Sequence, residues 1–241
     1  MERLDKLLSA MGVCARRETA AMAKRGEIRV DGEVCRDPAR KFAEGTPVEV
    51  RGEKLILKSR FYYMMNKPEG VLSSTEKRGD RTVVDLLPPR QQAQGLFPAG
   101  RLDRDSVGLL LLTNDGDLAH KLLSPKRHVD KIYEIRYKGT LDKHAPERFT
   151  AGLEIDGGEL CLPAKLELTD GDGALVTLHE GKFHQVKRMI AAVGGEVYAL
   201  RRIAFGPLRL DETLEPGAFR ELTREELEVL INAPSGGSEK L

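Results

Sequence analysis

Residues 98–116 read PAGRLDRDSVGLLLLTNDG, and this stretch predicts most about the fold. The uncharged run over residues 106–113 is short and a turn signal follows it, so we interpret it as a buried strand rather than a helix. Asp103 lies just before this strand, between Arg101 and Arg104. Burying charge is costly unless the charge is paired. The cluster is therefore either a structural ion pair or the carboxylate of a catalytic site.

The composition predicts a soluble globular protein. The 241 residues allow one or two domains, and 40% are hydrophobic while 32% are charged. No apolar run reaches membrane-spanning length and the N-terminus is charged, so we expect a cytoplasmic protein without a membrane partner. The three cysteines are widely spaced and suggest neither a disulfide framework nor a metal pair.

Residues 1–50 predict a small basic module. Helical spacing over residues 2–11 and 16–25 is followed by an alternating hairpin pattern around Asp31 and Gly32. Such a module can hold a phosphate backbone, and the alternative is a merely solvated pair of helices. The candidate RNA-binding residues are Arg3, Lys6, Arg16, Arg17, Lys24 and Arg25.

The rest of the chain predicts a second domain over residues 61–232. Residues 51–60 lack a clear period and are interpreted as a linker, and residues 233–241 are expected to be disordered. Residues 131–137 alternate as a strand that carries Tyr133, which pattern alone would place on a sheet face. A turn at residues 66–70, NKPEG, is expected to display Lys67.

Residues 180–195, EGKFHQVKRMIAAVGG, form the second informative stretch. Lys182, His184, Lys187 and Arg188 gather near the start of a predicted helix, where positive charge opposes the helix dipole. This placement favours an anionic partner. His179 and His184 are five residues apart and do not fit an HExxH zinc site, and no phosphate loop or dinucleotide motif is present. No metal or cofactor is implied.

Three motifs, in this order, resemble those of the pseudouridine synthases: NKPEG, GRLDRDSVGLLLLTNDG and EGKFHQVKRMIAAVGG. The resemblance is to the RsuA branch of that superfamily, and residues 1–50 resemble the RNA-binding domain of ribosomal protein S-four. It implies an α+β fold, in which the small RNA-binding domain precedes a mixed, mainly antiparallel sheet with flanking helices. It also implies an isomerase that needs no cofactor.

The resemblance implies roles for individual residues. Asp103 would attack the target uridine, at carbon 6 of the base or carbon 1 of the ribose, and Tyr133 would stack on the uracil. Lys187 falls where much of the superfamily carries an arginine paired with the catalytic aspartate, although its role could be exchanged with that of Arg188. The predicted substrate-binding residues are Arg101, Arg104, Lys67, Arg188 and Lys182.

The HQVKRM form of the last motif points to a small-subunit enzyme, and the resemblance suggests uridine 516 of 16S ribosomal RNA as the target. The partner would be naked 16S RNA or an assembling small subunit, bound by a monomer. The alternatives are a non-catalytic RNA-binding or ribosome-assembly factor, and the same reaction on large-subunit ribosomal RNA or transfer RNA.

Overall fold

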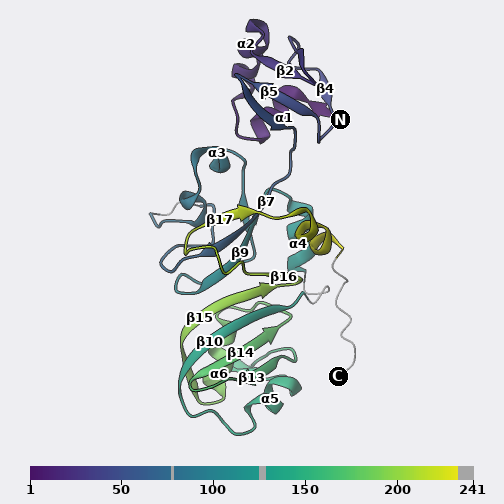
Figure 1. The fold of residues 1–241 in the computed structure, drawn as a ribbon. Coiled ribbons are helices and arrows are strands. Elements are labelled where there is room, and N and C mark those ends of the chain that lie inside the picture. Colours follow the sequence, from purple (N-terminus) through teal and green to yellow (C-terminus); the bar gives the residue numbers. More distant parts are fainter. Residues whose placement is uncertain (77–78, 125–128, 233–241) are drawn as a thin grey trace. The chain divides into compact units, whose positions relative to one another are not determined.

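The computed structural model describes residues 1–76, 79–124 and 129–232 (Figure 1). They form two compact units that interleave along the chain. The first unit comprises Met1–Tyr62, Val84–Phe97 and Thr113–Asp115, and the second comprises Tyr63–Val83, Pro98–Leu112 and the chain from Gly116 onward. The predicted disordered tail, residues 233–241, lies outside the described residues.

The first unit contains the predicted helix pair and hairpin. Helices α1 (Leu4–Ala10) and α2 (Arg16–Arg25) accompany a sheet of order β3-β2-β5-β6. Its strands are β2 (Ile28–Val30), β3 (Glu33–Val34), β5 (Pro47–Val50) and β6 (Glu53–Ile56); β1 (Glu2–Arg3) pairs with β4 (Lys41–Phe42), and Val83–Leu86 and α3 (Pro89–Gln92) are short helical turns. Asp31 and Gly32 have φ of 49° and 84°, which is the geometry of a tight hairpin turn.

The segment interpreted as a linker, residues 51–60, contributes a strand instead. Strand β6 pairs antiparallel with β5 through a turn in which Arg51 and Gly52 both have positive φ. The prediction missed it because Glu53, Lys54 and Ile56 are all exposed. A strand without a buried face shows no alternation of apolar residues.

The second unit is built on one large sheet, whose order is β13-β14-β10-β15-β9-β7-β17. Its strands are β7 (Tyr62–Lys67), β9 (Val107–Thr113), β10 (Lys131–Gly139), β13 (Lys165–Leu168), β14 (Gly173–Leu178), β15 (Gly195–Phe205) and β17 (Phe219–Glu221), with β8 (Phe97–Ala99) beside β9 and β16 (Leu208–Arg209) beside β15. Strands β11 (Glu154–Ile155) and β12 (Glu159–Leu160) form a separate hairpin. The predicted strand at residues 106–113 is confirmed, and Leu109–Leu112 are fully buried.

The helices of the second unit are α4 (Gly116–Leu123), α5 (Ala145–Ala151), α6 (Gln185–Ala192) and α7 (Arg224–Ile231). Helix α6 packs on β15 and α5 on β13, near the curved group of long strands in Figure 1. Phe149, Met189 and Ile190 are fully buried between these helices and the sheet. The predicted α+β fold with a mainly antiparallel sheet is confirmed. None of the described helices is long and apolar enough to cross a bilayer.

Strands β9 and β15 approach each other closely at one point. They run parallel, with Gly108 opposite Arg202. A Cβ atom on Gly108 would lie 2.4 Å from the backbone oxygen of Arg202, and Gly108 has φ of +99°. Only glycine meets both conditions without strain. This contact sets the distance between the strand that follows Asp103 and the strand that carries Arg202.

We predict that Gly108→Ala lowers the free energy of unfolding by about 3 kcal/mol, because it combines backbone strain with a clash against β15. Urea unfolding measures the change. Gly116→Ala is the matched control, since a Cβ there meets nothing within 4 Å and its φ is ordinary. Equal stability of the two variants would contradict the close approach.

Candidate active site

The loop that carries Asp103 joins β8 to β9 and is held by its backbone. Ser106 donates its N–H to the Asp103 carbonyl oxygen at 3.1 Å, which closes a turn. The Ser73 hydroxyl donates to the carbonyl oxygen of Leu102 at 2.9 Å and accepts from its N–H at 3.1 Å. Hydrogen bonds therefore fix the backbone of the turn at Leu102 and at Asp103, from which the carboxylate projects.

Lys67 is not displayed by the NKPEG turn, and that prediction is wrong. Its side chain is fully buried, and its ammonium donates to the carbonyl oxygens of Ser106 at 2.7 Å, Pro68 at 3.0 Å and Arg104 at 3.4 Å. Burial lowers the pKa of Lys67 to about 8, and the nearby Asp105 and Asp103 carboxylates oppose the shift. These hydrogen bonds attach Lys67 to the loop that carries Asp103.

Asp103 and Tyr133 line one cavity of about 650 Å³. The Asp103 side chain is 33% exposed, whereas Tyr133 is 8% exposed on β10. Leu178 and Leu200 contribute buried apolar walls to the same cavity. The cavity therefore joins a solvent-accessible carboxylate to an interior with buried aromatic and apolar walls, and a concave site of this kind can hold a small molecule or a base.

Two basic residues of the 180–195 stretch, His184 and Lys187, lie near this carboxylate. His184 Nε2 lies 3.6 Å from Asp103 Oδ1. The Lys187 ammonium instead donates to both oxygens of Asp105, at 2.7 and 2.6 Å, although Lys187 also lines the cavity. This hydrogen bond is the main reason that the pKa of Asp105 lies below its ordinary value. The pairing of Lys187 with Asp103 that the resemblance implied is thus replaced by a pair with Asp105.

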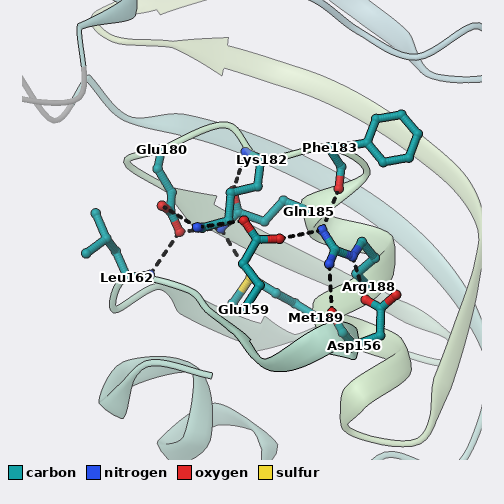
Figure 2. A network of polar contacts seen from close by, with 9 residues as sticks. All are labelled: Asp156, Glu159, Leu162, Glu180, Lys182, Phe183, Gln185, Arg188 and Met189. Carbon is teal, nitrogen blue, oxygen red and sulfur yellow. Dashed lines mark hydrogen bonds and ion pairs between the residues drawn. The ribbon is translucent and has the colours of Figure 1, made fainter. Parts of the chain in front are cut away.

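The other cations of the stretch belong to a polar network on the β11–β12 hairpin (Figure 2). Arg188 donates to Asp156 Oδ1 at 2.5 Å and to Glu159 Oε2 at 2.8 Å, and Lys182 donates to Glu159 Oε1 at 2.9 Å. Gln185 completes the network by donating to Glu180 at 2.7 Å. The anionic partner that we expected for Arg188 and Lys182 is therefore within the protein.

This network also shapes the start of α6. Lys182 donates its N–H to Gln185 Oε1 at 2.9 Å, and His184 has a left-handed backbone with φ of 50°. Phe183, 75% exposed, stacks on the His184 ring with centroids 3.8 Å apart. Both rings line the cavity that contains Asp103.

The predicted substrate-binding residues thus divide into two groups. Arg101 is exposed and lines the cavity, as does Lys182 despite its ion pair. Arg104 pairs with Asp80 at 3.3 Å, and neither Arg104 nor Arg188 is among the residues that line this cavity. Arg188 and Lys187 are therefore not interchangeable, because only Lys187 faces the cavity.

Sequence reasoning missed Lys131 and Arg202, which also line the cavity and are 8% and 1% exposed. Burial and the charge of Arg202 lower the pKa of Lys131 to about 8. Lys131 shares the strand and face of Tyr133 by the two-residue period, and this signal could have identified it. Arg202 offered no such signal, since its neighbour Arg201 is equally basic.

The basic residues of the first unit differ in how they are held. Arg3 and Arg16 both donate to the buried Asp5, and Lys6 pairs with Glu2 at 2.5 Å. Arg25 pairs with Glu27. Arg17 and Lys24 are exposed and lie seven residues apart on α2, so they share one face of that helix.

We predict that Lys187→Met raises the pKa of Asp105 toward its ordinary value, because the variant loses the hydrogen bond and charge that stabilise the carboxylate. Carboxyl carbon NMR titration measures the change. The native pair contributes its small stability above the unfolded pKa and loses it as pH falls through the lowered one. Lys182→Met, which removes a cation paired with Glu159, is the control. An unchanged Asp105 titration in Lys187→Met would rule out the pair.

Comparisons with known proteins agree with this architecture. The family model described as RNA pseudouridylate synthase matches residues 61–192, and the S4 domain model matches residues 2–48. A solved structure described as a pseudouridylate synthase is 32% identical, covers 95% of this chain and 100% of its own, and superposes with a TM-score of 0.67.

Curated relatives span nearly the whole chain. An uncharacterized RNA pseudouridine synthase of Bacillus subtilis, YtzG, is 46% identical over 96% of this chain and 99% of its own. The ribosomal small subunit pseudouridine synthase A of Vibrio cholerae is 44% identical over 93% and 97%. The ribosomal large subunit pseudouridine synthase B of Bacillus subtilis is 36% identical over 95% and 96%. The family models match an S4 domain followed by a pseudouridine synthase domain, and the relatives span nearly the whole chain. The chain therefore belongs to the RNA pseudouridine synthases, in their RsuA branch.

Proposed function

We propose that this enzyme converts a uridine of small-subunit ribosomal RNA to pseudouridine at the Asp103 cavity. The observation that carries the proposal is the shared cavity of Asp103 and Tyr133, which is accessible at the carboxylate and has buried walls that include Tyr133, Leu178 and Leu200. Uridine 516 of 16S ribosomal RNA is the proposed target, and the substrate is free or assembling small-subunit RNA. The proposed enzyme acts as a monomer in the cytoplasm.

In this mechanism the target nucleotide leaves its stack and enters the cavity base first, at a cost of a few kcal/mol that contacts in the site offset. Asp103 attacks the nucleotide, and Tyr133 packs against the uracil ring. The walls formed by Leu178 and Leu200 exclude water while the base is detached. His184, beside Asp103, and the exposed Arg101 lie where the phosphate of the flipped nucleotide would be held.

The choice of a small-subunit target rests on the relative in Vibrio cholerae, which is named for that activity and is 44% identical. A large-subunit target is the second candidate, because a relative of that name is 36% identical over nearly the same length. Separate incubation with the two RNAs, followed by carbodiimide treatment and primer extension, distinguishes them. A stop that appears only on large-subunit RNA would overturn the proposed target.

We predict that Asp103→Asn abolishes pseudouridine formation while RNA affinity stays within about threefold of the parent, because the amide keeps the shape of the carboxylate but is not a nucleophile. The carbodiimide assay and filter binding measure the two quantities. Asp105→Asn is the matched control, since Asp105 is two residues away but does not line the cavity. Turnover near the parental level in Asp103→Asn would remove Asp103 from the mechanism.

We predict that the exposed face of α2 grips the RNA backbone. Arg17→Gln combined with Lys24→Gln should weaken RNA binding and reduce the slope of log affinity against log salt by about 2, because each lost phosphate contact removes about one released counterion. The modified uridine should stay the same. Arg3→Gln is the control, because Arg3 is already bound to Asp5. An unchanged slope in the double variant would place the RNA elsewhere.

A further inference from the structure

Arg202 carries a buried donor that has no acceptor in the described part of the chain. It is 1% exposed, and its Nε donates to the backbone oxygen of Leu109 at 2.8 Å. Its Nη2 is buried and has no hydrogen-bond partner among the described residues. An unsatisfied buried donor costs about 1–3 kcal/mol, and more when the group is charged. Native proteins rarely retain such a group without a function for it.

The position of this guanidinium is tightly constrained. On one side Arg202 lies opposite Gly108, at the close approach of β15 to β9. On the other side it lies opposite Tyr133, across the antiparallel pair of β15 and β10. Its guanidinium carbon is 5.2 Å from the centre of the Phe205 ring. Arg202 is also one of the residues that line the cavity of Asp103.

The burial of the cavity residues indicates which group of the substrate could accept a hydrogen bond from Nη2 of Arg202. The exposed Arg101 and the 40% exposed His184 side chain lie at the accessible part of the cavity, where the phosphate of an RNA chain can stay solvated. Arg202, Tyr133 and Lys131 belong to the buried part, which only the group farthest from the RNA backbone can reach. Lys131 already donates to the carbonyl oxygen of Val129 at 3.1 Å, whereas Nη2 of Arg202 has no partner among the described residues. For a flipped nucleotide that group is the base. The oxygen acceptors of uracil are its two carbonyl groups.

We propose that Arg202 is a catalytic residue, whose Nη2 donates a hydrogen bond to uracil O4 and stabilises the negative charge that the ring gains during isomerisation. The inference rests on the proposed role of the Asp103 cavity. When the N1–C1′ bond breaks, its electron pair stays on N1 and is delocalised onto O2 and O4. If Asp103 adds to carbon 6 first, the ring electrons move to O4 as an enolate. In both routes O4 becomes a stronger acceptor.

The remaining steps balance without an outside reagent. The base turns, carbon 5 forms the new bond to C1′, and the bond between Asp103 and the nucleotide breaks, which restores the carboxylate. The proton on carbon 5 leaves to a base, and N1 gains a proton. Negative charge on O4 is greatest before the new bond forms. A donor fixed in a dry site stabilises such a transient charge more than it stabilises the neutral ground state.

A cycle that changes both partners tests the contact. Wild type and Arg202→Met are each given RNA with uridine or 4-thiouridine at the target, labelled with tritium at carbon 5, and tritium release is followed in single-turnover reactions. We expect Arg202→Met to slow release from uridine by about 10²-fold, as loss of an oxyanion donor does, with RNA affinity within about threefold. Sulfur is a weaker acceptor, so 4-thiouridine should slow the wild type at least about tenfold more than it slows Arg202→Met.

Arg201→Met is the matched control, because Arg201 is the next residue on β15, pairs with Glu212 and does not line this cavity. Its thio effect should equal that of the wild type. If Arg202→Met does not fold, Arg202→Lys replaces it, since a single nitrogen placed to donate to the Leu109 oxygen cannot also occupy the position of Nη2. Equal thio effects in wild type and the Arg202 variant would overturn the proposal.

These reactions use whichever RNA the wild type modifies. An error in the proposed target uridine therefore does not affect the comparison of the thio effects. Turnover retained by Asp103→Asn would instead overturn the cavity as the reaction site, and the Arg202 proposal with it.

Discussion

The buried ammonium of Lys67 is the contact on which the arrangement of this site depends. A fully buried cation must find acceptors, and here the acceptors are backbone carbonyl oxygens in and beside the turn that follows Asp103. Lys67 therefore couples the NKPEG turn to the loop that carries the carboxylate. Because the bonds are to backbone, they hold the loop whatever side chains it displays. The carboxylate is thereby kept free for chemistry.

Most of the charged side chains near the cavity are also held by contacts within the protein. Many cations of the 180–195 stretch are neutralised by the protein, Arg188 and Lys182 by the β11–β12 hairpin and Lys187 by Asp105. These pairs give rigidity more than stability, since exposed pairs contribute little free energy. They leave the Phe183–His184 stack and Arg101 at the accessible part of the cavity and Arg202 within it. The proposed site for a flipped base uses this division, with exposed polar groups near the phosphate and the buried Arg202 near the ring.

Local patterns predicted the elements well because their causes are local. The hairpin at residues 27–34, the helix at 16–25 and the buried strand at 106–113 each follow from a turn signal and a period. Strand β6 was missed because it has no buried face, and its pairing with β5 depends on a neighbour rather than on its own pattern. The family resemblance also singled out Asp103 and Tyr133, which the folded chain brings into one cavity.

The sequence by itself determined most of the secondary structure, the family and the aspartate in its basic setting, because these follow from local patterns and motifs. Which cation meets which anion was decided only by the tertiary structure. Lys187 is 82 residues from Asp105, and Lys67 is 39 residues from Ser106, so no period or spacing reports either contact. The same holds for Arg202, whose burial is imposed by the close approach of β9 at Gly108. Whether a charged side chain binds substrate or protein depends on what the fold places within about 3 Å of it.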